Sequence, residues 1–304
     1  MKNIRGTLTE NAPIGAQSWF RCGGAADLLF KPADEDDLAA FLSQWSADQP
    51  LTIIGGLANT IIRDGGLRGA TIQLDKAFSS VKVLNDTYIS AGCGALNGNV
   101  AAAAVKAGIG GMEFLSGIPG SLGGALRMNA GAYGAEIKDI FVGATAIDRK
   151  GNPHRLTAED MHFTYRHCGV HHDLIFTSAI LKGRAEDYET VKARITEIKA
   201  KRNETQPIRE CTGGSTFANP SETELKKAGL PPGTRAWQIV DMVGGRGLRM
   251  GGAQMNELHC NFMINTGDAS AADLENLGNE LRRRALYDLG VKLHWEIKRI
   301  GQES

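Results

Sequence analysis

A glycine-rich stretch from Gly110 to Gly134 constrains the fold of this chain more than any other feature of the sequence. Its glycines interrupt apolar residues with little period, so the stretch fits neither one amphipathic helix nor an alternating strand. Because glycine has no Cβ, this pattern favours backbone that wraps closely around something over a regularly packed element. Glycine is also in excess overall, at 38 of 304 residues, against a usual level of roughly 7%.

A second glycine-rich loop lies earlier in the chain. Leu51–Ile54 is a short apolar run that predicts a strand, and Gly55–Asn59 follows it as a tight turn. Successive small residues in a turn expose N–H groups in a concave nest that suits a diphosphate, and Asn59 could add a side-chain donor. Taken alone, this loop is better interpreted as an ordinary glycine turn than as a site for a cofactor diphosphate. Two such loops on one α/β unit indicate a long cofactor, and a flavin dinucleotide has that length.

Neither loop matches the commoner nucleotide-binding motifs. Gly117–Gly124 lacks the Gly-Lys-Ser/Thr of a Walker loop, and it is not a dinucleotide fingerprint, which needs a strand before it and a helix opening within it. A Rossmann fold is therefore disfavoured. The sequence also has no GxSxG elbow and no spacing of histidine and acid that points to a hydrolytic triad.

The rest of the chain predicts mixed helices and strands in two packed units. Residues 33–47 carry apolar side chains at helical spacing, 97–107 predict an alanine-rich helix, and 174–181 predict a strand. A further helix starts near Tyr188, with Val191, Ile195 and Ile198 on the same face. We expect a domain boundary at Thr205–Pro207, because proline stops this helix.

The C-terminal region predicts a capped helix and an alternating strand. Ser270 and Asp273 form a capping-box pattern before a helix that ends at Gly290. From Val291 to Lys298 apolar and polar residues alternate, as in a strand with one buried face. Glu296 lies on the polar face of this strand, so it is expected to be held rigidly opposite the core.

Composition excludes several classes of function. Lysine plus arginine and aspartate plus glutamate both number 34, so no overall field attracts a polyanion, and nucleic acid is not an expected partner. Neither the five scattered cysteines nor His259 shows metal-ligand spacing, so no metal is assigned and reduced thiols are expected. No stretch approaches the roughly 20 apolar residues of a membrane span, and the polar N-terminus lacks a signal-peptide core. A cytoplasmic protein without membrane insertion is expected.

Taken in order, the motifs of the chain resemble those of the UDP-N-acetylenolpyruvoylglucosamine reductase (MurB) family, in the short form often called type II. The resemblance runs from about Trp19 to Gly301. Each motif is weak alone, but their ordered co-occurrence is specific. The segments that carry it are Phe20–Gly24, Gly55–Gly69, Gly117–Gly134, Tyr165–Arg166, Gln206–Pro207, Gly213–Phe217 with Asn219–Pro220, Gly247–Arg249 and Trp295–Ile297.

The resemblance implies a fold, a cofactor and a reaction. The fold is α+β: a vanillyl-alcohol-oxidase (PCMH-type) FAD-binding domain of two α/β subdomains, 1–70 and 71–204, and a MurB-type substrate domain, 205–304. FAD is the implied bound cofactor and NADPH the hydride-donating cosubstrate. The implied reaction reduces UDP-N-acetyl-3-O-(1-carboxyvinyl)glucosamine to UDP-N-acetylmuramate in peptidoglycan precursor synthesis. The expected partner is therefore a UDP-sugar, and a monomer is expected.

The resemblance also implies site residues. The catalytic residues are Arg166, Ser215 and Glu296, with Ser215 as the proton donor. Hydride addition builds enolate-like charge on the substrate carboxylate, so a cation and a fixed proton-donating network suit this chemistry. The substrate-contact candidates are Tyr165, Arg202 and Asn219. The cofactor-binding residues are Gly55, Gly56, Leu57, Ala58, Asn59, Ile118, Pro119, Gly120, Ser121, Gly123, Gly124, Asn129, Gly131 and Ala132.

Three positions depart from the family pattern. Ala58 and Asn256 stand where serine is usual, and Ala218 stands where lysine is usual. Ala58 deletes a hydroxyl but leaves the N–H groups of its loop, whereas Ala218 removes a cationic contact. These changes keep open a second hypothesis, a flavin-binding protein of the same fold without turnover. A third, an FAD-dependent oxidase of the wider superfamily, is disfavoured by the stretch Gly213–Pro220.

Overall fold

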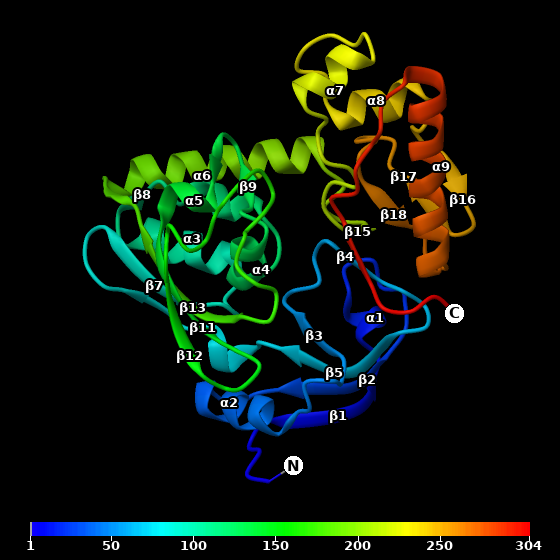
Figure 1. Cartoon of the computed structure of the whole chain (residues 1–304). Coiled ribbons are helices and arrows are strands. Elements are labelled where there is room, and N and C mark those ends of the chain that lie inside the picture. The colour runs from blue at the N-terminus through cyan, green and yellow to red at the C-terminus, as the bar shows by residue number, and fades with distance from the viewer. Residues whose placement is uncertain (1) are drawn as a thin grey trace. The chain divides into compact units, whose positions relative to one another are not determined.

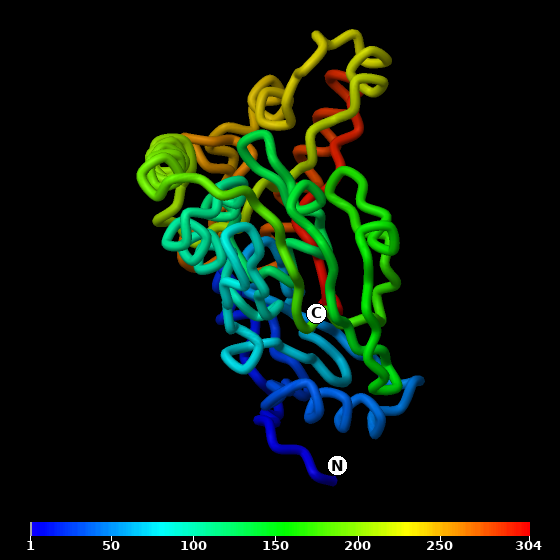
Figure 2. Tube along the Cα trace, turned by 90° about the vertical axis from the view of Figure 1, so that its left-hand side faces the viewer, coloured from blue at the N-terminus to red at the C-terminus, as the bar shows by residue number. Residues whose placement is uncertain are grey.

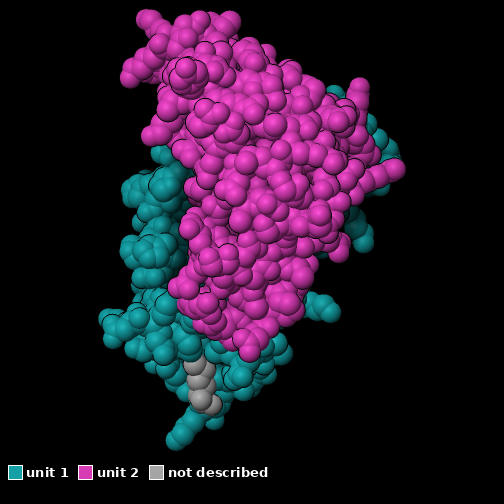
Figure 3. Space-filling view, turned by 90° about the vertical axis from the view of Figure 1, so that its right-hand side faces the viewer, with its two compact units in different colours: residues 1–10, 28–56, 69–202 teal, residues 11–27, 57–68, 203–304 magenta. Residues whose placement is uncertain are grey.

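The computed structural model describes residues 2–304, and the chain forms two compact units. Each unit is assembled from separated segments of the chain. Unit 1 takes the chain up to Glu10, 28–56 and 69–202, and unit 2 takes 11–27, 57–68 and 203–304 (Figure 3, teal and magenta). The C-terminal third of the sequence is therefore completed by two short N-terminal segments.

The larger sheet of unit 1 is antiparallel throughout, with the strand order β12-β11-β13-β7-β6. Its strands are β6 (Val81–Val83), β7 (Tyr88–Gly92), β11 (Phe141–Ile147), β12 (Pro153–Thr157) and β13 (Ile175–Lys182). Helices α3 (Asn97–Lys106) and α4 (Leu122–Arg127) pack against it (Figure 1). Val100, Ala101 and Ala104 of α3 are buried in this core, where small side chains let the helix approach the sheet closely.

A smaller sheet, of order β1-β2-β5-β3, is formed by the N-terminal part of the chain, and β3 and β5 in it are parallel. Its strands are β1 (Thr7–Ala12), β2 (Ala26–Lys31), β3 (Leu51–Ile54) and β5 (Leu67–Gln73). Helix α2 (Glu35–Gln44) begins after Asp34, whose carboxylate accepts from the N–H of Asp37 at 2.9 Å. Phe41 of α2 stacks on Phe30 with ring centroids 4.3 Å apart, so the helix predicted within 33–47 is confirmed.

The longest helix that begins in unit 1 is α6 (Tyr188–Thr205), which Figure 2 views nearly along its axis. Val191 and Ile195 are buried as predicted, whereas Tyr188 is 46% exposed and its ring lies under the ammonium of Lys192 instead. The short elements are η1 (Lys76–Phe78), β8 (Ile109–Gly110), η2 (Glu113–Gly117), β9 (Gly131–Ala132), β10 (Ala135–Glu136), α5 (Ile137–Ile140) and β14 (Arg184–Ala185). No helix within residues 2–304 combines the length and the hydropathy that crossing a bilayer requires.

Unit 2 is built on the sheet β15-β18-β17-β16, which α9 (Ala271–Leu289) covers (Figure 1). Ser270 Oγ accepts from the N–H of Asp273 at 3.0 Å and the Asp273 carboxylate accepts from the N–H of Ser270 at 3.0 Å. The predicted capping box is thus confirmed, and the helix ends at Gly290 with φ of +67°. The other elements are α7 (Glu222–Lys227), α8 (Ala236–Met242), β15 (Cys211–Thr212), β16 (Arg249–Met250), β17 (Ala253–Met255) and β18 (Met263–Asn265).

The two N-terminal segments supply α1 (Ile14–Gln17) and β4 (Thr60–Ile62) to unit 2, and β4 pairs in parallel with β19 (Lys298–Ile300). The strand predicted over 291–298 is only partly regular. Its alternation is confirmed, since Val291, Leu293 and Ile297 are buried. Regular pairing starts only at Lys298, because the partner strand β4 has only three residues. The segment just before Lys298 makes a single bridge, from Trp295 to Phe217.

Candidate active site

The two glycine-rich loops that predict a cofactor site come together in unit 1. Gly55 and Gly56 follow β3, and Gly120 and Ser121 precede α4. A Cβ placed on Gly55 would lie 2.3 Å from the Ser121 Oγ, and one placed on Gly56 would lie 3.0 Å from the Gly120 Cα. The loops therefore approach backbone to backbone, which a side chain at either glycine would disturb.

This convergence fits a diphosphate-bearing cofactor such as FAD. Ser121 Oγ makes no capping hydrogen bond to α4 and faces Gly55 instead. Gly120 has φ of +93°, a conformation that favours glycine. A hydroxyl and glycine backbone thus lie close together, and such groups suit phosphate oxygens. Of the other predicted cofactor residues of this segment, Ile118 and Pro119 lie just before Gly120, and Gly124, Gly131 and Ala132 follow it up to the end of β9.

Two predicted cofactor residues, Gly123 and Asn129, make hydrogen bonds to other residues of unit 1. The N–H of Gly123 donates to the Cys93 carbonyl oxygen at 2.8 Å. The Asn129 side chain is fully buried; its Oδ1 accepts from the N–H of Lys138 at 3.0 Å, and its Nδ2 donates to the Glu136 carboxylate at 2.8 Å. These contacts hold the loop in shape, which is a structural role that the sequence did not reveal.

Arg166 occupies a tight turn beside the same segment. Thr164 and His167 exchange main-chain hydrogen bonds of 3.0 and 3.2 Å, and Arg166 between them has φ of +56°, which is strained for a residue with a side chain. Its guanidinium donates to the Gly131 carbonyl oxygen at 2.8 Å. Asn129 Nδ2 also donates to the Thr164 carbonyl oxygen at 3.0 Å. The structure thus joins the Arg166 turn to the glycine-rich segment.

Tyr133, which sequence reasoning missed, links this segment to Arg202 near the end of α6. Tyr133 has φ of +54°, and its ring occupies the space beside Gly117, where a Cβ would lie 2.4 Å from it. Burial lowers the pKa of the Arg202 guanidinium and raises the pKa of the Tyr133 hydroxyl, and each group partly offsets the other's shift. Tyr165, by contrast, is 55% exposed and lies against the Arg166 guanidinium. The sequence signal that could have identified Tyr133 is a single aromatic residue between two small ones, Ala132 and Gly134.

In unit 2 the segments that carry Ser215 and Glu296 run antiparallel to each other. The N–H of Glu296 donates to the Thr216 carbonyl oxygen at 2.8 Å, and the N–H of Ala218 donates to the His294 carbonyl oxygen at 2.9 Å. Ser215 and Glu296 are both partly buried. Two of the three predicted catalytic residues therefore lie on paired segments of one unit, and Arg166 belongs to the other unit.

The remaining predicted residues of unit 2 make specific internal contacts. Asn59 Oδ1 accepts from the N–H of Gly214 at 3.1 Å. Asn219 is exposed, and its Oδ1 accepts from the N–H of Ala236 at the start of α8 at 3.0 Å. Before Asn59, the predicted cofactor residues Leu57 and Ala58 are buried. Leu57 has φ of +49°, so this turn departs from ordinary backbone geometry.

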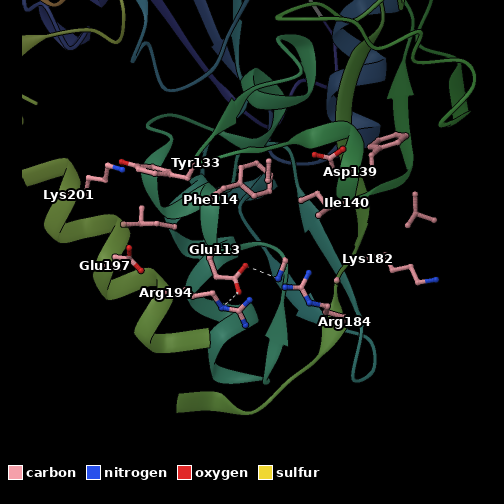
Figure 4. Close-up of a pocket in the computed structure, with 16 residues that line it drawn as sticks. Glu113, Phe114, Tyr133, Asp139, Ile140, Lys182, Arg184, Arg194, Glu197 and Lys201 are labelled. Carbon is pink, nitrogen blue, oxygen red and sulfur yellow. Dashed lines mark hydrogen bonds and ion pairs between the residues drawn. The ribbon is translucent and has the colours of Figure 1, made fainter. Parts of the chain in front are cut away.

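Unit 1 also has an open groove of about 810 Å³ that contains none of the predicted site residues. Helix α6 contributes Arg194 and Glu197 to its lining, and Phe114, Tyr133 and Ile140 are among the other residues that line it (Figure 4). Glu113 and Arg194 face each other within it, as an ion pair of 3.2 Å (Figure 4). The groove therefore does not coincide with the convergence of the glycine-rich loops.

The chain is similar over almost its whole length to a curated reductase. It is 52% identical over 301 residues to the UDP-N-acetylenolpyruvoylglucosamine reductase of Parvibaculum lavamentivorans, covering 99% of this chain and 93% of that protein. This chain belongs to the UDP-N-acetylenolpyruvoylglucosamine reductase family. The family model for the C-terminal domain of that reductase matches residues 206–300, and a model described as an FAD binding domain matches 26–157.

Solved structures agree with membership of the UDP-N-acetylenolpyruvoylglucosamine reductase family. The reductase (MurB) of Thermus caldophilus superposes with a TM-score of 0.80 at 27% identity, covering 98% of this chain and 99% of that one. The 6-hydroxy-D-nicotine oxidase of Arthrobacter nicotinovorans superposes with a TM-score of 0.58 at 13% identity, covering 96% and 87%. The second likeness is one of fold alone, and the match of 206–300 to the reductase model disfavours the oxidase hypothesis. The expected FAD-binding and MurB-type architecture is confirmed.

Proposed function

We propose that this protein reduces the enolpyruvyl ether UDP-N-acetyl-3-O-(1-carboxyvinyl)glucosamine to UDP-N-acetylmuramate, a step of peptidoglycan precursor synthesis. FAD is the bound cofactor and NADPH is the hydride-donating cosubstrate. The observation that carries the proposal is the antiparallel pairing of the Ser215 and Glu296 segments in a chain of this family. We further propose that the enzyme acts as a cytoplasmic monomer on a soluble UDP-sugar.

We propose that cofactor binding and substrate binding are assigned to three parts of the chain, 1–70, 71–204 and 205–304. The first two hold FAD through the glycine-rich loops, and the third binds the UDP-sugar. Because Gly55 faces Ser121 across the loops, the cofactor diphosphate is the group best matched to that place. When bound, the flavin supplies a hydride to the terminal vinyl carbon of the substrate.

Arg166 is proposed to hold the substrate carboxylate. Charge develops on that carboxylate as its neighbouring carbon becomes enolate-like, so a fixed guanidinium there stabilises the transition state more than the ground state. Its anchoring contact with the Gly131 carbonyl oxygen supports such a fixed position. A lysine at this place would lose the planar fork that matches a carboxylate.

Ser215 is proposed to give a proton to the carbon that bears the carboxylate, with Glu296 completing the proton-donating network. A serine hydroxyl is a weak acid, so it works only against a strongly basic carbon and only when held in position. The backbone pairing of Glu296 with Thr216, next to Ser215, supports such positioning. Tyr165, Arg202 and Asn219 are proposed to contact the rest of the substrate.

The departures at Ala58 and Ala218 motivate the alternative of a flavin protein without turnover. Ala58 is 6% exposed, so the missing hydroxyl is lost from a buried turn. The N–H of Ala218 still pairs with the His294 carbonyl oxygen, which keeps the segment in place although the cationic side chain is gone. Retention of Arg166, Ser215 and Glu296 favours an active enzyme.

A spectroscopic titration of the purified protein tests the proposal. The protein should be yellow, NADPH added without oxygen should bleach it, and the enolpyruvyl UDP-sugar should then restore the colour. A yellow protein that stays reduced after addition of the sugar would establish the alternative without turnover. A colourless protein that does not take up added FAD would overturn the flavin assignment.

A further inference from the structure

We infer that Asn59 is a positioning residue for Ser215, in addition to its place in the glycine-rich loop. The inference rests on the proposed role of Ser215 as proton donor. In this inference the loop Gly55–Asn59 has a second function besides cofactor binding: it holds the backbone immediately before Ser215, whose hydroxyl gives the proton. The contacts that support it all lie within unit 2.

The first contact fixes the peptide group on the N-terminal side of Ser215. Asn59 Oδ1 accepts from the N–H of Gly214 at 3.1 Å. A Cβ placed on Gly214 would lie 3.3 Å from the Asn59 amide carbon, and one placed on Gly213 would lie 3.2 Å from Asn59 Oδ1. Close packing against Asn59 therefore explains Gly214, whereas at Gly213 the Phe20 ring is nearer still, at 2.8 Å from the same Cβ position.

The same residue also fixes the chain that follows Glu296. The N–H of Lys298 donates to the main-chain carbonyl oxygen of Asn59 at 3.1 Å, and β4 continues this contact as a parallel pair with β19. Asn59 thus bonds through its side chain to the segment of Ser215 and through its backbone to the segment of Glu296. One residue sets the positions of both.

A second asparagine holds the C-terminal side of Ser215. Asn261 is 4% exposed, its carbonyl oxygen accepts from the N–H of Thr216 at 2.7 Å, and its amide exchanges two hydrogen bonds with the Phe217 backbone at 3.0 and 2.9 Å. The backbone on both sides of Ser215 is therefore held by buried or partly buried amides. Such fixing suits a weak acid, because its proton must be delivered from one defined place.

The test replaces Asn59 with a residue that keeps or removes the acceptor for Gly214. N59L is nearly isosteric and lacks the acceptor, whereas N59D keeps an oxygen at the position of Oδ1. Bound flavin is quantified by its absorbance, and the two half-reactions are followed separately per bound flavin. N276L, an exposed position of α9 in the same unit, is the matched control.

N59L is expected to slow flavin reoxidation by the enolpyruvyl UDP-sugar about tenfold or more, as for the loss of precise orientation. Its flavin reduction by NADPH should change by less than about threefold on the same reasoning. N59D should recover most of the reoxidation rate, and N276L should behave as the unmodified protein. In an S215A background, N59L should add little, because the group that Asn59 positions is already gone.

The inference is overturned if N59L slows both half-reactions equally, if N59D is as slow as N59L, or if N59L retains its full effect in the S215A background. If N59L loses FAD on purification, as a residue of the cofactor loop can, it is reconstituted with FAD and judged by the same two rates. Failure of the proposed function is seen separately. If S215A alone reoxidises at the normal rate, Ser215 is not the proton donor, whatever the Asn59 variants show.

Discussion

Gly278 of α9 lies directly against the indole ring of Trp295. A Cβ placed on Gly278 would lie 2.1 Å from the Trp295 Cη2 and 2.7 Å from the Met263 Cε. The indole also packs against Phe217, with ring centroids 5.4 Å apart. The residue that precedes Glu296 thus packs against both the helix and the segment that carries Ser215.

Replacing Gly278 with alanine should therefore destabilise unit 2. Alanine favours a helix over glycine by about 1 kcal/mol, but its methyl group overlaps a rigid ring, and such overpacking costs about 1–3 kcal/mol. We expect a net loss in the free energy of unfolding, measured by urea denaturation. G98A in α3 is the matched control, because no atom beyond its chain neighbours and the nearby backbone of its own helix lies within 4 Å of a Cβ there, and it should be neutral or stabilising. A G278A protein as stable as G98A would contradict this close packing.

Replacing Ser215 with alanine should separate the two half-reactions. NADPH should still bleach the flavin at the normal rate, while reoxidation by the enolpyruvyl UDP-sugar should slow by about 10²-fold or more, as for the loss of a general acid. Stopped-flow absorbance of the flavin measures both rates. Unimpaired reoxidation would remove Ser215 from the mechanism.

Replacing Glu296 with glutamine should leave FAD bound and slow only the reaction with the UDP-sugar. The side chain acts on the substrate in the proposed mechanism, and glutamine keeps its size while removing its charge. The ratio of flavin to protein absorbance after purification measures retention. Colourless E296Q protein would show instead that this residue supports the cofactor.

Acid should weaken unit 2 partly through His259. Burial lowers the pKa of His259, and its Nδ1 accepts from the N–H of Asn261 at 3.2 Å, a bond that requires the neutral ring. The unfolded chain therefore takes up the proton first, at about pH 6.5, so the contribution of His259 is full above that pH and is lost as the pH falls below it.

Urea denaturation between pH 8 and pH 5 measures this dependence. H259Q should show a shallower fall in the free energy of unfolding than the unmodified protein. Equal slopes for the two proteins would mean that His259 does not titrate with folding.

Local features of the fold could be predicted from the sequence. The capping box of Ser270 and the alternation of Val291–Ile297 depend on spacing within a few residues, and both are confirmed. The regular strand is shorter than predicted, because its partner β4 comes from a distant part of the chain and is short.

Contacts between distant segments could not be predicted in the same way. Gly213 and Gly214 belong to a motif of the family resemblance, but nothing in the sequence says that Phe20 and Asn59 pack against them. Asn129 was assigned to the cofactor because it lies in a glycine-rich loop, yet its side-chain hydrogen bonds all stay within unit 1. A polar residue in a glycine-rich loop can hydrogen-bond to a ligand or to the loop itself, and only the three-dimensional structure distinguishes these two roles.

The assembly of unit 2 from three segments has a consequence for synthesis of the protein. Thr60 leaves the ribosome more than 200 residues before its strand partner Lys298. Phe20 likewise precedes Asn265, whose Nδ2 donates to its carbonyl oxygen at 2.8 Å, by 245 residues. Such long-range pairing delays folding and exposes unpaired segments meanwhile. The matched domain at 206–300 is therefore not a free-standing module, and nascent chains that stop before β19 should depend on chaperones.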